Sequence, residues 1–217
     1  MIKIFFALLI IFYLNACSFK TAPNEWQIKS TTAFNSYSQN YLKANDVLAK
    51  NDLKRAIKHA KQSADLSQLG KIYLGECAFK ISAGAKNECT KFKKISALIH
   101  DKTLNAYYSF ITLTIKPEQI DELPQRYRTF ASFLIQKNFQ KANSELFEIE
   151  EVTSSLLCAA LMKEHLKATS RKKILKLSSF YGYKRVVLFW LHESKKYVKD
   201  KHELEKIEAK ISILSSN

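Results

Sequence analysis

Four cysteines offer the most definite chemistry in this sequence, and two of them are spaced for a cross-link. Cys77 lies seven residues before Gly84, and Cys89 lies five residues after it. Because glycine readily ends a helix, a helical hairpin folded at Gly84 would bring the two sulfur atoms to similar heights. An oxidising compartment would favour a Cys77–Cys89 disulfide, and two buried thiols are the alternative. Cys158 lies in a wholly apolar stretch, where we expect an inert core residue.

The other reactive residue types do not form a catalytic or metal-binding pattern. The cysteines include no CxxC pair, and the histidines form no HExxH or similar spacing. We therefore expect no metal and no cofactor, and we expect surface or boundary positions for His59, His100, His165, His192 and His202. Glu193-Ser194 resembles the catalytic dipeptide of lytic transglycosylases, but the glycine-rich and glutamine-bearing motifs of that family do not follow it. We expect a protein that is not an enzyme.

The first 17 residues have the layout of an export signal. Lys3 supplies a short positive start, and residues 4–14 form an unbroken apolar run of 11 residues. A bilayer span needs about 20 residues, so this run better suits the hydrophobic region of a signal peptide. It ends in Leu14-Asn15-Ala16-Cys17, which resembles the lipobox of bacterial lipoproteins. An ordinary signal peptide and an uncleaved anchor are the alternatives.

The lipobox resemblance implies cleavage before Cys17 and lipidation of that residue. Acyl chains on Cys17 would anchor the protein stably to a membrane. The non-acidic Ser18 implies, by the same resemblance, the outer membrane and a position facing the periplasm. We expect residues 1–16 to be the signal peptide, 17–30 a tether and 31–217 the folded domain.

Composition and periodicity predict an all-α domain. The chain of 217 residues contains 4 glycines and 3 prolines, about 2% and 1%, against usual fractions of about 7% and 5%. All-β folds need these residues at many turns. From Thr32 onward, apolar residues recur every three to four positions, which is typical of helices.

We expect a first helical hairpin over 32–66, with its turn at Asn51-Asp52 and Asp52 capping the second helix. The segments 68–82 and 87–99 would form the next pair. Pro117 and Pro124 would begin new helices, since proline is tolerated in a first turn. The remaining expected helices are 102–114, 124–136, 139–150, 153–168, 171–181, 183–198 and 201–214.

A faint internal repeat relates two of these hairpins at an offset of 86 residues. It pairs Asp52 with Asn138 and Ala56 with Ala142. A small residue early in a second helix resembles the tetratricopeptide-type hairpin, although that repeat is about 34 residues long. The resemblance implies antiparallel hairpins stacked as a short tetratricopeptide-like or other α-solenoid array. A compact irregular helical domain is the alternative, and the single Gly182-Tyr183 turn is weak support for ankyrin repeats.

Charge is distributed unevenly along the chain. The formal net charge is +15; residues 163–217 contribute +8, whereas residues 118–151 contribute −3. A basic surface attracts anions such as lipid head groups, wall polymers, nucleic acid or an acidic protein. A solubilising, lysine-rich surface is the other interpretation. The candidate anion-binding residues are Arg171, Lys172, Lys173, Lys176, Lys184, Arg185, Lys195 and Lys196.

Together these features predict a lipid-anchored envelope scaffold or adaptor that binds a protein partner. Its partners would be the membrane, through the N-terminal lipid, and another envelope protein. The alternative is a lipoprotein that docks on a wall polymer, acidic glycolipid or DNA through the basic residues. High salt would weaken the second mode far more than the first.

Overall fold

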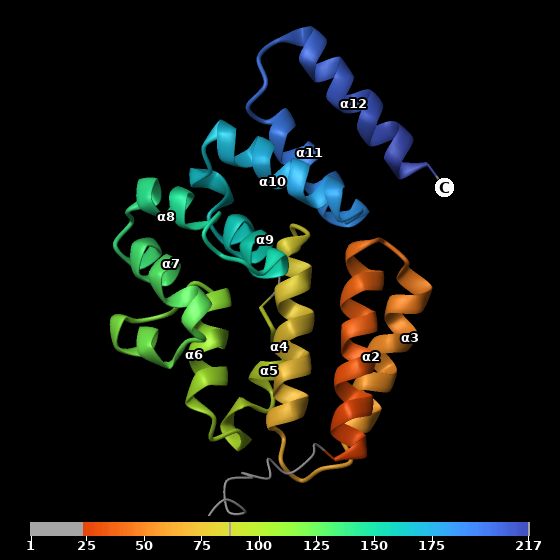
Figure 1. The fold of residues 1–217 in the computed structure, drawn as a ribbon, viewed down its shortest axis with the longest axis vertical. Helices are drawn as coiled ribbons and strands as arrows, with labels where there is room; N and C mark the ends of the chain where they lie inside the picture. Colours follow the sequence, from red (N-terminus) through yellow and green to blue (C-terminus); the bar gives the residue numbers. More distant parts are fainter. Residues whose placement is uncertain (1–23, 87, 217) are drawn as a thin grey trace, which may run out of the picture.

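The computed structural model of the chain describes residues 24–86 and 88–216. Within this part the chain forms α-helices and short 3-10 helices (η) and contains no strand, so the expected all-α fold is confirmed (Figure 1). The elements are α2 (Glu25–Leu42), α3 (Asp46–Ala60), α4 (Ser67–Ser82), α5 (Thr90–Lys93), η2 (Ser96–Leu98), α6 (Lys102–Ile111), η3 (Pro117–Glu122), α7 (Gln125–Ile135), α8 (Phe139–Glu145), α9 (Val152–Leu161), η4 (Lys163–His165), α10 (Ala168–Phe180), α11 (Lys184–Lys195) and α12 (Lys201–Ser215).

Three antiparallel helical hairpins, α2/α3, α7/α8 and α10/α11, are built around the same turn. In each turn one residue has a positive φ, namely Ala44 (66°), Lys137 (55°) or Gly182 (65°). The next residue donates its backbone N–H to the carbonyl five positions earlier, which satisfies a free helix-end carbonyl. These bonds join Asn45 to Asn40 (2.8 Å), Asn138 to Phe133 (2.8 Å) and Tyr183 to Ser178 (2.9 Å).

The first hairpin turns at residues 43–45, so the turn expected at Asn51-Asp52 is wrong. Asp52 lies inside α3 and is buried, where it accepts hydrogen bonds from Asn40 (2.7 Å) and Arg55 (2.5 Å). In a sequence, a short acidic residue that accepts a hydrogen bond across a hairpin looks the same as one that caps the start of a helix. Asn138 at the α7/α8 turn has the same position as Asn45 at the α2/α3 turn, 93 residues earlier. The offset of 86 residues therefore does not relate the two turns.

Other expected boundaries also differ from the structure; for example, the helix expected over 153–168 ends at Leu161 and is followed by η4. α2 begins at Glu25, so the tether expected over 17–30 extends into the first helix. Asn24 donates its N–H to the Gln27 side chain (3.1 Å), and the buried Ser30 hydroxyl donates to the Ala56 carbonyl (3.1 Å), which fix this helix start. The helix expected over 87–99 is reduced to α5 and η2, and the one over 139–150 ends at Glu145.

α4 is the centre of the molecule. It packs against α2 and α3 on one side and against α5, α6 and α9 on the others (Figure 1). The buried residues on α4 include Leu69, Ile72, Leu74 and Cys77, which point in several directions around the helix. α9 is buried in the same way over residues 154–160, as its apolar sequence predicts. A helix with no polar face is stable only with neighbours all round.

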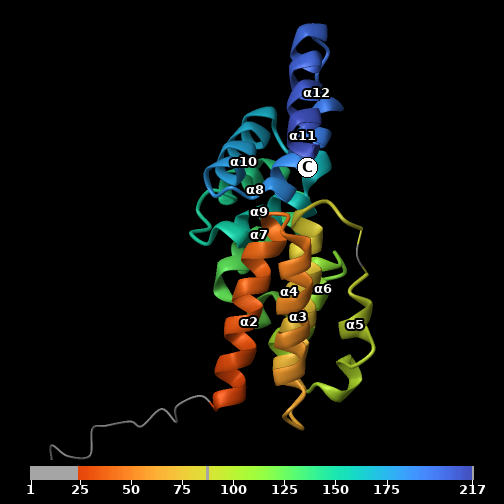
Figure 2. The ribbon, with the colours of Figure 1, turned by 90° about the vertical axis from the view of Figure 1, so that its right-hand side faces the viewer.

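The array curls, so that α11 returns to the first hairpin (Figure 1). Arg185 on α11 donates from Nε to the Tyr41 carbonyl (2.8 Å), stacks 4.4 Å from the Tyr41 ring centre and pairs with Asp46. α12 then packs on α11 and forms the outer end of the molecule (Figure 2). No helix among residues 24–86 and 88–216 is long and apolar enough to cross a bilayer.

Candidate functional site

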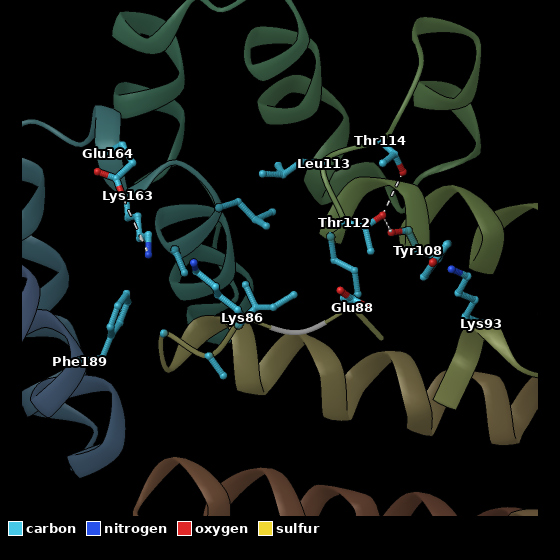
Figure 3. A pocket seen from close by; sticks show the side chains of 16 residues that line it. Lys86, Glu88, Lys93, Tyr108, Thr112, Leu113, Thr114, Lys163, Glu164 and Phe189 are labelled. Carbon is cyan, nitrogen blue, oxygen red and sulfur yellow. Dashed lines mark hydrogen bonds and ion pairs between the residues drawn. The ribbon is translucent and has the colours of Figure 1, made fainter. Parts of the chain in front are cut away.

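An open groove of about 640 Å³ lies beside the C-terminal end of α4, and we call it the central groove (Figure 3). Its walls are the α4–α5 connection, the C-terminal ends of α6 and α9, and one side chain of α11. The apolar side chains that line it are Ile81, Ala85, Ile111, Leu113, Ala160, Leu161 and Phe189. Leu113 is 56% exposed and therefore offers apolar surface to a bound molecule.

The first wall is fixed by close contact between Gly84 and Phe189. Gly84 follows the end of α4 with φ +85°, a conformation that side chains other than glycine rarely adopt. A Cβ built on Gly84 would lie 2.2 Å from Cδ2 of Phe189. The phenyl ring of α11 therefore rests directly on the turn, and this contact joins the groove wall to the C-terminal hairpin.

A disulfide holds the same wall from the other side. Cys77 on α4 is bonded to Cys89, with 5.4 Å between their Cα atoms. Lys91 on α5 donates to the buried Glu76 carboxylate of α4 (2.7 and 2.9 Å), and Lys80 donates to it as well (2.6 Å). The α4–α5 connection is thus tied to the central helix by a covalent bond and an ion pair.

The rim of the central groove carries both signs of charge. Lys163 and Phe189 lie toward one end, Lys93 and Tyr108 lie toward the other, and Glu88 lies between them (Figure 3). Lys86 and Glu164 complete the charged lining. Thr112 and Thr114 are hydrogen-bonded to each other (3.0 Å), and Thr112 also donates to the Tyr108 carbonyl (2.8 Å). An apolar floor with a mixed-charge rim suits the side chains of a peptide.

The basic residues selected from the sequence do not form one continuous surface. α10 and α11 are antiparallel, so Arg171 at the start of α10 lies beside the end of α11, 3.7 Å from the Tyr197 ring centre. Lys172, Lys195 and Lys196 lie at this same end of the hairpin. Lys184 and Arg185 lie at the opposite end, next to the α2/α3 turn, and the exposed Lys176 lies between the two ends.

Five of these eight residues have partners within the molecule. Arg171 donates to the Leu166 carbonyl (2.7 Å), and Arg185 binds the first hairpin. The other three pairs are Lys173 over the Phe147 ring (4.6 Å), Lys195 with Glu208 (2.6 Å) and Lys196 with Glu193 (2.7 Å). Part of the basic character of this region therefore serves to hold helices together.

The remaining candidates occupy structural positions. Cys158 is fully buried, and burial raises the pKa of its thiol well above the ordinary value. Glu193 is 6% exposed, and its hydrogen bond to Lys196 raises the pKa of that amine. Ser194 donates to the Trp190 carbonyl (2.7 Å) within the helix. His165 stacks on Phe139 with 3.6 Å between ring centres.

Cys17 and the lipobox lie outside the described residues. In the part of the chain that the structure describes, no group of three or more His, Cys, Asp or Glu side chains could hold a metal ion. Sequence reasoning missed the central groove, because its lining comes from four separate stretches of the chain; the sequence predicts Gly84 as a helix end but not as part of a groove. No protein-family model matches the chain, and no curated protein or solved structure matches it significantly.

Proposed function

We propose that this protein is a lipid-anchored adaptor of the cell envelope, which binds a protein partner in its central groove. The proposed anchor rests on the resemblance of Leu14-Asn15-Ala16-Cys17 to a lipobox. The proposed binding role rests on the groove itself, where Leu113 and Leu161 offer apolar surface within reach of charged groups.

The observation that carries the binding proposal is the combination of a fixed wall with an exposed apolar lining. Gly84 against Phe189, and the Cys77–Cys89 disulfide, hold the wall before any ligand arrives. A preorganised surface loses little conformational entropy on binding, which favours recognition of a flexible segment. Charges of both signs along an open rim match a polypeptide better than a small ligand of one charge.

A photo-crosslinking amino acid placed at Leu113 in living cells tests the partner. We expect it to capture a discrete protein, and we expect the same group at Leu98 to capture none. Leu98 is a matched control, because it is 67% exposed and does not line the groove. Equal capture from both positions, or none from Leu113, would show that the groove is not the binding site.

The anchor has a separate test in Cys17→Ser. The variant should remain uncleaved or leave the membrane fraction, because no thiol is left to carry the lipid. Cleavage and membrane fractionation like those of the unmodified protein would refute the anchor and leave the groove proposal intact.

A further inference from the structure

A second groove, of about 820 Å³, lies between α12 and the α10/α11 hairpin, and we call it the C-terminal groove. Its floor is apolar and comes from all three helices and the loop before α12. The floor residues are Leu175, Leu191, Tyr197, Val198 and Ile207. Leu191 and Ile207 are 3% and 9% exposed, so the floor is continuous with the packing between the helices.

The rim of the C-terminal groove is strongly basic. The cationic lining residues are Arg171, Lys172, Lys199, Lys206 and Lys210. Asp200 and Glu203 are the acidic ones, and the Asp200 carboxylate is engaged at the start of α12, where it accepts the Glu203 N–H (2.7 Å). Five cations against two carboxylates give the groove a net charge of +3, with His202 also at the rim.

Two features place the rim cations beside the apolar floor of the C-terminal groove. Lys206 and Lys210 are four residues apart on α12, so they project from one helix face about one turn apart. Arg171 lines the groove from α10, held by the Tyr197 ring (3.7 Å) and the Leu166 carbonyl (2.7 Å). Positive groups therefore border the apolar floor from both sides.

We propose that the C-terminal groove binds an amphipathic helix of a partner protein, with the apolar stripe of that helix on the floor and acidic residues along its flanks. Helix-in-groove docking uses such a stripe, and acidic flanks complement the basic rim. A flat lipid surface would meet mainly the rim cations, whereas a helix could also cover the apolar floor. This site is distinct from the central groove, so the adaptor would hold two different segments.

The test uses the full-length protein and a fluorescent peptide of about 18 residues, five helical turns, with leucines at helical spacing and glutamates beside them. We expect anisotropy to show saturable binding. The double substitution Lys206→Glu and Lys210→Glu should weaken it by about tenfold or more, because two attractions become repulsions. The matched control is Lys50→Glu and Lys54→Glu, also exposed and four residues apart, on α3.

Val198→Asn isolates the floor, since it replaces apolar surface with a neutral polar group and leaves the net charge and all five rim cations in place. It should also weaken binding by about tenfold or more, with helix content unchanged by circular dichroism. A scrambled peptide of equal composition that binds equally well would overturn the proposal. Equal loss in the control variant would do so too. Binding to phosphatidylglycerol vesicles without binding to the peptide would replace the partner helix with a membrane.

Discussion

The central groove and the C-terminal groove both have apolar lining and a charged rim, but they differ in what supports their walls. The central groove has a wall fixed by the Cys77–Cys89 disulfide and by Phe189 resting on Gly84. The C-terminal groove has α12 as one wall, where Ile207 is the one buried residue and Lys195–Glu208 is an ion pair to α11 (2.6 Å). The first site is preorganised, whereas the second has a wall that can adjust to its ligand.

The substitution Gly84→Ala should break the central wall and have the largest effect. We expect the free energy of unfolding to fall by about 3 kcal/mol, because a positive φ costs a side chain about 1–2 kcal/mol and overpacking adds about 1–3 kcal/mol. Denaturant titration measures it. Gly182→Ala is the matched control, with φ +65° and no atom within 4 Å of a new Cβ. Equal losses of unfolding free energy in the two variants would mean that the clash with Phe189 adds nothing to the cost of Gly84→Ala.

Removing the disulfide should loosen the same wall less drastically. The double substitution Cys77→Ser and Cys89→Ser opens a loop between residues 12 apart and should cost about 2–3 kcal/mol of unfolding free energy. Crosslinking from Leu113 should also decline in this variant. Reduction should raise the mass of the native protein by two hydrogen atoms. No such rise would contradict the disulfide itself.

Ile207→Ala addresses the wall of the C-terminal groove. Truncating this residue should cost about 2 kcal/mol, the low end for a buried aliphatic side chain, mostly as local opening of α12, because so little else on that helix is buried. Hydrogen exchange should quicken over residues 201–215, while exchange in α4 stays unchanged. If α4 exchanges faster as well, the two walls unfold together and the contrast between the grooves is wrong.

Lys137→Gly isolates the free-energy cost of a positive φ, which is one of the two contributions expected for Gly84→Ala. Here the substitution removes that cost instead of adding it. Lys137 holds φ 55° with a side chain, so glycine should stabilise the protein by about 0.5–1 kcal/mol after the entropy of the unfolded chain is included. Lys137→Ala keeps the Cβ and should leave the thermal midpoint unchanged. Stabilisation by alanine as well would assign the gain to the lysine side chain.

The sequence is a good guide to the helices and to turns marked by glycine. Gly84 and Gly182 both adopt the positive φ expected at helix ends. Ala44 and Lys137 adopt it too, yet nothing about alanine or lysine marks a turn, so the first hairpin was expected to turn seven or eight residues too late. Buried Asp52 reinforced that error, because its partner Asn40 comes from the facing helix.

The grooves are far less accessible to sequence reasoning. Each is lined by segments that periodicity assigns to helices but does not place next to one another. The basic residues show the same limit: Arg185 and Lys172 look alike in sequence, but one is bound to the first hairpin and the other is exposed. Only packing decides which charges face a ligand.

The bond between Arg185 and Tyr41 spans 144 residues of the chain, and it has a consequence for how the protein matures. An open array of repeats can fold progressively, because each repeat contacts only its neighbours. Here the first hairpin lacks part of its packing until α11 has been synthesised and, if the chain is exported, has crossed the membrane. Such distant contacts slow folding. Early segments would therefore need protection from aggregation until the last hairpin closes on them.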